Sequence, residues 1–111
     1  MQTATVKGTY ASSAISTVVT AVGGYTPPAS TAAIISALTI CNTSAATRKV
    51  KVSIYNGTTD YYVAFNAPIA VGDSLMIGGA DAKYTLQTGW SVRVVADAAQ
   101  VDATMAVTEF A

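Results

Sequence analysis

Apolar and polar residues alternate most regularly between residues 48 and 56 of the chain. The two alternating sets are Val50, Val52 and Ile54 on one side and Lys49, Lys51, Ser53 and Tyr55 on the other. Because successive side chains of a β-strand point to opposite faces of its sheet, this segment is predicted to be a strand with one buried and one wet face. The sequence contains no sustained helical stripe that competes with this pattern.

Short segments of the same kind, separated by turn residues, fill the rest of the chain, which is typical of an all-β sandwich or barrel. Besides 48–56, the expected strands cover residues 3–10, 15–22, 33–42, 61–67, 74–77, 83–87, 90–96 and 104–110. Their connections are about three to six residues long, whereas parallel pairs need a dozen or more, so neighbouring strands are expected to be antiparallel. The predicted fold is a single antiparallel β-sandwich of about eight strands, jelly-roll or Ig-like, formed by residues 1–111 as one domain.

Individual segments give sharper expectations. Residues 33–42 are apolar on both faces, as in a central strand that is covered on both sides. Pro68 lacks an N–H donor, so the end of its strand belongs to a sheet edge or a bulge. Residues 98–107 are rich in alanine, yet their period of two predicts a strand; the positions that keep this period are Val101, Ala103, Met105 and Val107. Residues 1–6 fit either an ordinary first strand or an N-terminal arm.

The aromatic residues are candidates for a stacking platform that binds sugars or single-stranded nucleic acid. Alternation instead places Tyr61 and Phe65 in the core beside Val63, and it leaves Tyr55 and Tyr62 on the surface. In the segment 90–96 the same rule buries Trp90, Val92 and Val94 and turns Arg93 outward. Packing is therefore favoured for most of these rings, and exposed tyrosines also suit protein interfaces.

The small number and even balance of charged residues limit the kinds of partner that the protein is expected to bind. Charged residues make up 11% of the 111 residues, with six basic and six acidic side chains, which leaves no electrostatic footprint for nucleic acid or an anionic membrane. A surface this poor in charge suits a protein that packs against copies of itself or against a protein partner. The sequence shows no secretory signal, and its apolar stretches are shorter than the ~20 residues of a membrane-spanning helix. A soluble protein made in a cytoplasm is expected.

Candidate chemistry is sparse. The chain has no histidine and one cysteine, which argues against a Ser-His-Asp triad, a Cys-His pair or a zinc site. Cys41 is interpreted as a small buried hydrophobe in preference to a reactive thiol. The acidic residues are scattered without the pairing that a glycosidase needs; they are Asp60, Asp73, Asp81, Asp97, Asp102 and Glu109.

A calcium site formed by Asp73 and Asp81 is weighed against turn aspartates that bond their own backbone, and the turn interpretation is favoured. The glycines between Gly72 and Gly79 lack the lysine and the helix of a phosphate-binding loop. We therefore expect no catalytic, cofactor-binding or metal-binding residues, and a protein that is not an enzyme.

Several short motifs lie along about three-quarters of the chain. The run 25–44 contains Pro28-Ala29-Ser30-Thr31 and Cys41-Asn42. The alternating strand 50–55 follows, and then the segments 69–75 (Ile-Ala-Val-Gly-Asp-Ser-Leu) and 86–94 (Leu-Gln-Thr-Gly-Trp-Ser-Val-Arg-Val). This order resembles small structural proteins of tailed bacteriophages, except at Trp90, where that pattern usually has a polar residue.

The resemblance implies a non-enzymatic virion protein without an active site. The leading hypothesis is a capsid decoration (cement) protein, made in the host bacterial cytoplasm and located on the virion. Its implied partners are the major capsid protein or other virion proteins, and further copies of itself in a homo-oligomer. A tail or head-tail component is one alternative. A carbohydrate-binding or adhesin module that uses Tyr55, Tyr62 or Trp90 is another, so a glycan partner stays open but is not favoured.

Overall fold

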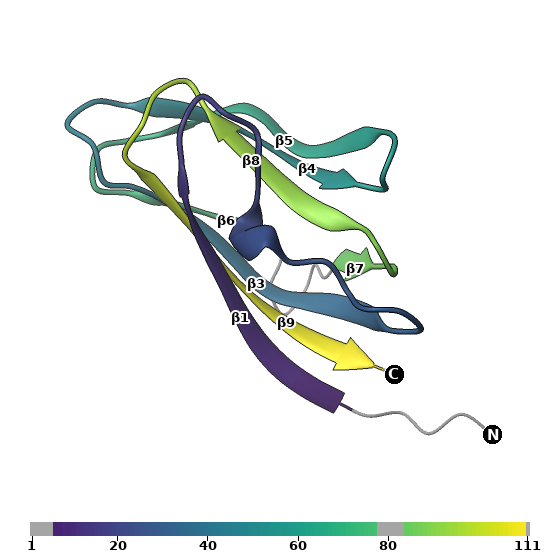
Figure 1. The fold of residues 1–111 in the computed structure, drawn as a ribbon. Coiled ribbons are helices and arrows are strands. Elements are labelled where there is room, and N and C mark those ends of the chain that lie inside the picture. Colours follow the sequence, from purple (N-terminus) through teal and green to yellow (C-terminus); the bar gives the residue numbers. More distant parts are fainter. Residues whose placement is uncertain (1–5, 78–83, 111) are drawn as a thin grey trace.

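The computed structural model describes residues 6–77 and 84–110, and within them it contains strands and one short 3-10 helix (Figure 1). The elements are β1 (Val6–Ile15), β2 (Thr20–Ala21), η1 (Val22–Gly24), β3 (Ala32–Asn42), β4 (Arg48–Tyr55), β5 (Asp60–Ile69), β6 (Ser74–Ile77), β7 (Tyr84–Leu86), β8 (Ser91–Ala96) and β9 (Val101–Phe110). Residues 1–6, for which an arm and a first strand were both open, lie outside the described residues except for Val6, which begins β1.

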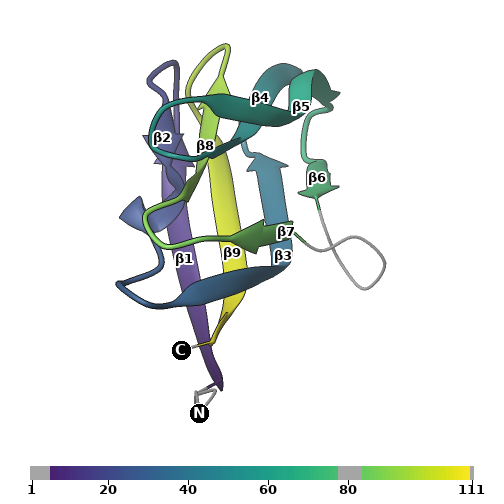
Figure 2. The ribbon, with the colours of Figure 1, turned by 90° about the vertical axis from the view of Figure 1, so that its right-hand side faces the viewer.

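The strands form two sheets that pack face to face. The larger sheet has the order β1-β9-β3-β6, with β7 also paired to β3, and the smaller sheet has the order β2-β8-β4-β5. In Figure 2, β1, β9 and β3 lie side by side. Every pairing between described strands is antiparallel, which confirms the predicted antiparallel β-sandwich.

Alternating apolar side chains from both sheets fill the space between the layers. The predicted facing is confirmed at β4, where Val50 and Val52 are completely buried. It is also confirmed along β9, whose buried positions are Val101, Ala103, Met105 and Val107. Burying a side chain of this size contributes roughly 1.5–3 kcal/mol, so the two faces together form the main stabilising element of the fold.

The prediction of a strand over residues 15–22 is wrong. Ile15 ends β1, β2 is only two residues long, and the intervening Val18 and Val19 are exposed. The chain crosses here from the larger to the smaller sheet, so these valines cannot join a continuous ladder. Gly23 makes the crossing tight: its φ is 62°, and a Cβ at this position would lie 2.6 Å from the Cβ of Ala11.

The strand β3 is central in its sheet but is covered on one face only. It pairs with β9 on one side and with β6 and β7 on the other. Its inward residues are buried, whereas its other face is half-exposed, so the prediction of cover on both sides is wrong. The predicted burial of Cys41 is wrong for the same reason, because Cys41 lies half-exposed on the outer face of a two-layer sandwich.

The strand β5 forms an edge of the smaller sheet and contains Pro68, as predicted. Its pairing with β4 shifts twice: the register passes from Val50↔Ala67 to Val52↔Ala64 and then to Ser53↔Tyr62. Each shift inserts one extra residue into β5, and a β-bulge of this kind reverses the facing of the residues that follow. The period of two therefore does not hold along β5.

Facing predictions for the aromatic residues fail at this strand. Tyr61 and Phe65 were expected in the core beside Val63, but each of the two is 59% exposed, whereas Val63 does pack against the core. Tyr62 is exposed, as predicted. Trp90 precedes β8 and is half-buried against the core.

Candidate functional site: the outer face of the smaller sheet

Two exposed aromatic rings meet on the outer face of the smaller sheet. Tyr62 and Phe65 lie with ring centroids 5.1 Å apart in an edge-to-face arrangement, and we call this pair the aromatic ridge. In a regular strand, residues three apart point to opposite faces. The bulges in β5 bring the two rings to the same face. Lys51 of β4 supports the ridge, since its Nζ lies 4.8 Å from the centroid of the Phe65 ring.

A network of polar side chains holds the surface beside the ridge. Arg93 of β8 places its guanidinium 4.2 Å from the centre of the Tyr55 ring, and its Nε lies 3.5 Å from Oδ1 of Asp60. The Ser53 hydroxyl donates to the same carboxylate oxygen at 2.8 Å. A partly exposed ion pair of this kind contributes only about 0.2–1 kcal/mol to stability. Its main effect is to fix the orientation of Arg93 and Tyr55.

This network corrects two predictions for β4. Ser53 was expected on the wet face, but it is only 4% exposed, because its neighbours on the outer face cover it. Tyr55 was expected on the surface, but it is half-buried beneath Arg93. Arg93 itself points outward, as predicted.

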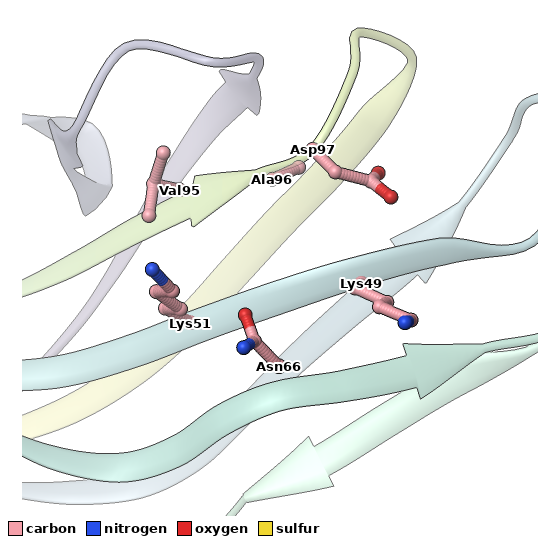
Figure 3. A pocket seen from close by; sticks show the side chains of 6 residues that line it. All are labelled: Lys49, Lys51, Asn66, Val95, Ala96 and Asp97. Carbon is pink, nitrogen blue, oxygen red and sulfur yellow. The ribbon is translucent and has the colours of Figure 1, made fainter.

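Lys51, which contacts Phe65 of the ridge, also lines a shallow hollow that we call the lysine hollow. Figure 3 shows the side chains that line it. Its lining residues come from β4, β5 and β8 and from the residue after β8; they are Lys49, Lys51, Asn66, Val95, Ala96 and Asp97. Its volume is about 150 Å³, whereas pockets for drug-sized ligands measure about 300–1,000 Å³. The lysine hollow thus has the size to receive a side chain of a protein partner.

A smaller hollow, of about 30 Å³, lies on the other side of Lys51. Lys51 and Val95 line both hollows, and Val19 and Tyr62 help to line the smaller one. Two neighbouring concave regions with both charged and apolar lining thus meet at Lys51 and Val95, and Tyr62 of the aromatic ridge borders the smaller one. Aromatic residues and arginine in such a setting are the residues that most often dominate protein–protein binding.

The remaining sequence candidates lie apart from this surface. Asp73 accepts a hydrogen bond from the backbone N–H of Ser74 at 2.8 Å, while Asp81 and the end of the 72–79 glycine segment lie outside the described residues. Within 6–77 and 84–110, no three metal-ligating side chains form a group. Because the calcium hypothesis includes Asp81, it falls partly outside the described residues.

Tyr25 and Glu109 form a separate polar pair beside the core. The Tyr25 hydroxyl donates to Oε2 of Glu109 at 2.7 Å. Partial burial, reinforced by this hydrogen bond and by the carboxylate charge, raises the pKa of Tyr25 above its ordinary value. The pair links the loop before β3 to the end of β9, and nothing in its surroundings suggests chemistry.

The residues of the carbohydrate hypothesis do not form one platform. Tyr62 is exposed on the ridge, Tyr55 is covered by Arg93, and Trp90 packs against the core. Sequence reasoning missed Phe65 as a surface residue. The signal that could have revealed it was Pro68, which marks an edge or a bulge in the same strand.

Comparisons with known proteins place the fold. No family model and no curated protein matches the chain. Among solved structures, a subunit of the disulfide-linked pili of Bacillus endospore appendages is similar over 99% of this chain and 88% of its own, with a TM-score of 0.59 and 16% identity. The virus-like particle of the extra small virus of the giant freshwater prawn Macrobrachium rosenbergii provides a second match, over 96% of this chain and 79% of that chain, with a TM-score of 0.50 and 16% identity.

At this level of identity, the likeness concerns the fold alone. The chain shares its β-sandwich with structural subunits of a pilus and of a virus-like particle.

Proposed function

We propose that the protein is a non-enzymatic structural subunit of a bacteriophage virion, and specifically a capsid decoration (cement) protein that binds the particle surface. The observation that carries the proposal is the aromatic ridge, an exposed pair of large rings on the outer face of the smaller sheet. Such rings bury large areas at little cost in conformational entropy when a partner covers them. In this view the major capsid protein, or another virion protein, is the partner that covers the ridge.

The composition and the fold both support a structural role. Sparse, balanced charge favours association with protein over association with nucleic acid or a charged membrane. Proteins of the same fold serve in a pilus and in a virus-like particle. The described part of the chain contains no helix that is long and apolar enough to cross a bilayer. A tail or head-tail component would use the same kind of surface, and the choice of a decoration protein rests on the resemblance to tailed-phage proteins.

The exposure of Tyr62 and Phe65 also favours a second candidate, a carbohydrate-binding module. Sugar rings stack on flat aromatic faces, but the interplanar angle of 83° means that the two rings do not form one flat platform. A glycan array that gives no binding with the wild-type protein would exclude this candidate.

The proposed function is tested by cosedimentation of the purified protein with empty capsids of the phage that encodes it. The double variant Tyr62→Ser/Phe65→Ser should lose at least about tenfold in affinity, because interface aromatic residues often contribute 2 kcal/mol or more. Met76→Ser removes an exposed apolar side chain on the larger sheet and should bind like the wild type. A wild-type protein that does not sediment with capsids, or a double variant with unchanged affinity, would refute the proposal.

A further inference from the structure

The turn between β5 and β6 presents an apolar side chain and a carboxylate together. Val71 is 57% exposed, and Asp73 is exposed beside it. The N–H of Asp73 donates to the carbonyl of Ala70 at 3.0 Å, and Gly72 has a φ of 73°, a conformation that glycine adopts without strain. The turn therefore projects both side chains from a tightly closed backbone.

A buried asparagine fixes the conformation of this turn. The Asn42 side chain is completely buried, and its Nδ2 donates to the carbonyl of Ile69 at 2.9 Å. The backbone of Asn42 adds two hydrogen bonds, from its N–H to the carbonyl of Asp73 at 3.0 Å and to its carbonyl from the N–H of Gly72 at 3.2 Å. A surface element that is already held in one conformation loses little conformational entropy on binding. The turn is thus prepared for docking.

The lysine hollow complements the turn in charge and in size. Lys49 and Lys51 outnumber Asp97 in its lining, so the hollow carries a net charge of about +1. Three described carboxylates are exposed, and Asp97 already lies in the hollow. Asp102 lies on the larger sheet beside small residues, whereas Asp73 has the exposed Val71 next to it. Among the described acidic groups, Asp73 is therefore the best match for the hollow.

We propose that the β5–β6 turn of a second copy docks in the lysine hollow, with its Asp73 carboxylate against Lys49 and its Val71 against the apolar lining. Within one molecule the turn and the hollow lie at the same end of the smaller sheet, because Lys49 pairs with Pro68 and the turn begins two residues later. Two such contacts can form together around a two-fold axis, which gives a closed dimer. This inference goes beyond the proposed function, because the aromatic ridge stays free for the particle.

Sedimentation velocity of the full chain over a range of concentrations tests this dimer. The wild type should dimerise, and Lys49→Asp or Asp73→Lys should each weaken the dimer at least about tenfold, because each places like charges together. The double variant Lys49→Asp/Asp73→Lys should dimerise again, as should an equimolar mixture of the two single variants. Asp102→Lys makes the same change of charge on the larger sheet and should leave dimerisation unchanged.

Recovery in the double variant cannot come from misfolding, so it separates docking from structural damage. A wild type that remains monomeric, or single variants without effect, or a double variant without recovery would overturn the inference. A monomer that still binds empty capsids would overturn the dimer and leave the proposed function standing. If the double variant recovers dimerisation but the wild type does not bind capsids, the dimer stands and the proposed function fails.

Discussion

The buried side chain of Asn42 offers a sharp test of how the fold is held together. Its Nδ2 donates to the carbonyls of Ile69 and Ala46, at 2.9 and 2.8 Å. Its Oδ1 accepts from the N–H and the hydroxyl of Ser44, at 2.9 and 2.6 Å. One amide thus joins the loop after β3 to the end of β5. Replacement by alanine would remove all of these hydrogen bonds at once.

The loss of stability in Asn42→Ala depends on how many hydrogen-bonding groups lose Asn42 as a partner and cannot bond to water instead. The carbonyl of Ile69 and the N–H of Ser44 are buried, whereas the carbonyl of Ala46 is partly accessible and can bond to solvent. A buried group that loses its partner costs about 1–3 kcal/mol, so two such groups give a loss of about 4 kcal/mol for Asn42→Ala. For a domain of this size, that loss corresponds to a fall in Tm of roughly 15–25 °C.

Asn56→Ala is the matched control. Oδ1 of Asn56 also accepts two backbone hydrogen bonds, from Thr58 and Thr59, but both are exposed. Water replaces them, and the expected loss is below about 1 kcal/mol. Urea unfolding followed by Trp90 fluorescence measures both variants. Equal losses for the two variants, or a loss below about 1.5 kcal/mol for Asn42→Ala, would refute the reasoning.

Three further predictions test separate parts of the structure. Val52→Asp buries an unpaired charge and should lower the free energy of unfolding by about 3–5 kcal/mol. The neighbouring Lys51→Asp should lower it by less than about 1 kcal/mol. Similar Tm values for the two variants would contradict the facing of β4. Gly23→Ala places a side chain at a positive φ and against Ala11, so it should lower the free energy of unfolding by about 1–3 kcal/mol. An unchanged midpoint in urea unfolding would show that the chain is not tightly packed where it crosses between the sheets. The raised pKa of Tyr25 means that its hydrogen bond contributes stability fully below about pH 10, the unfolded pKa, and loses that contribution as the pH rises further. The gap in Tm between the wild type and Tyr25→Phe should therefore narrow from about pH 9 to about pH 11, and a constant gap would contradict this linkage.

The sequence predicts the regular strands well. In β4 and β9 one residue in two is apolar, and these residues are the ones that meet in the core. When only one face of a strand is buried, the alternation of apolar and polar residues is enough to predict which side chains point into the core. The all-β class and the antiparallel pairing could be predicted for the same reason.

Predictions fail where the backbone leaves a regular ladder. Residues 15–22 are apolar enough for a strand, but Val18 and Val19 lie where the chain crosses between the sheets. Whether such a segment forms a strand or a crossing depends on its pairing with strands that are distant in the sequence. Along β5, an extra residue after Tyr62 turns Phe65 to the outer face, whereas Tyr61 is exposed although it pairs with Ile54, which packs against the core. A bulge depends on the lengths of two paired strands, so a single strand read alone does not reveal it.

The candidate surface follows from these irregularities. Tyr62 was expected on the surface, but its partner Phe65 was expected in the core. The contacts of Arg93 with Tyr55 and Asp60 depend on the order β8-β4-β5, which strand patterns alone do not provide. Sequence reasoning could thus propose a structural role from composition and resemblance, whereas the residues of the surface required the structure.

A cryo-EM map of virions that carry the protein tests the central claim most directly. The claim is that the folded chain acts as a passive building block whose aromatic ridge is covered by a neighbouring protein. The map should show the β-sandwich on the particle, with the rings of Tyr62 and Phe65 packed against another virion chain. Virions that lack the protein, or a bound protein whose ridge faces solvent, would contradict the claim.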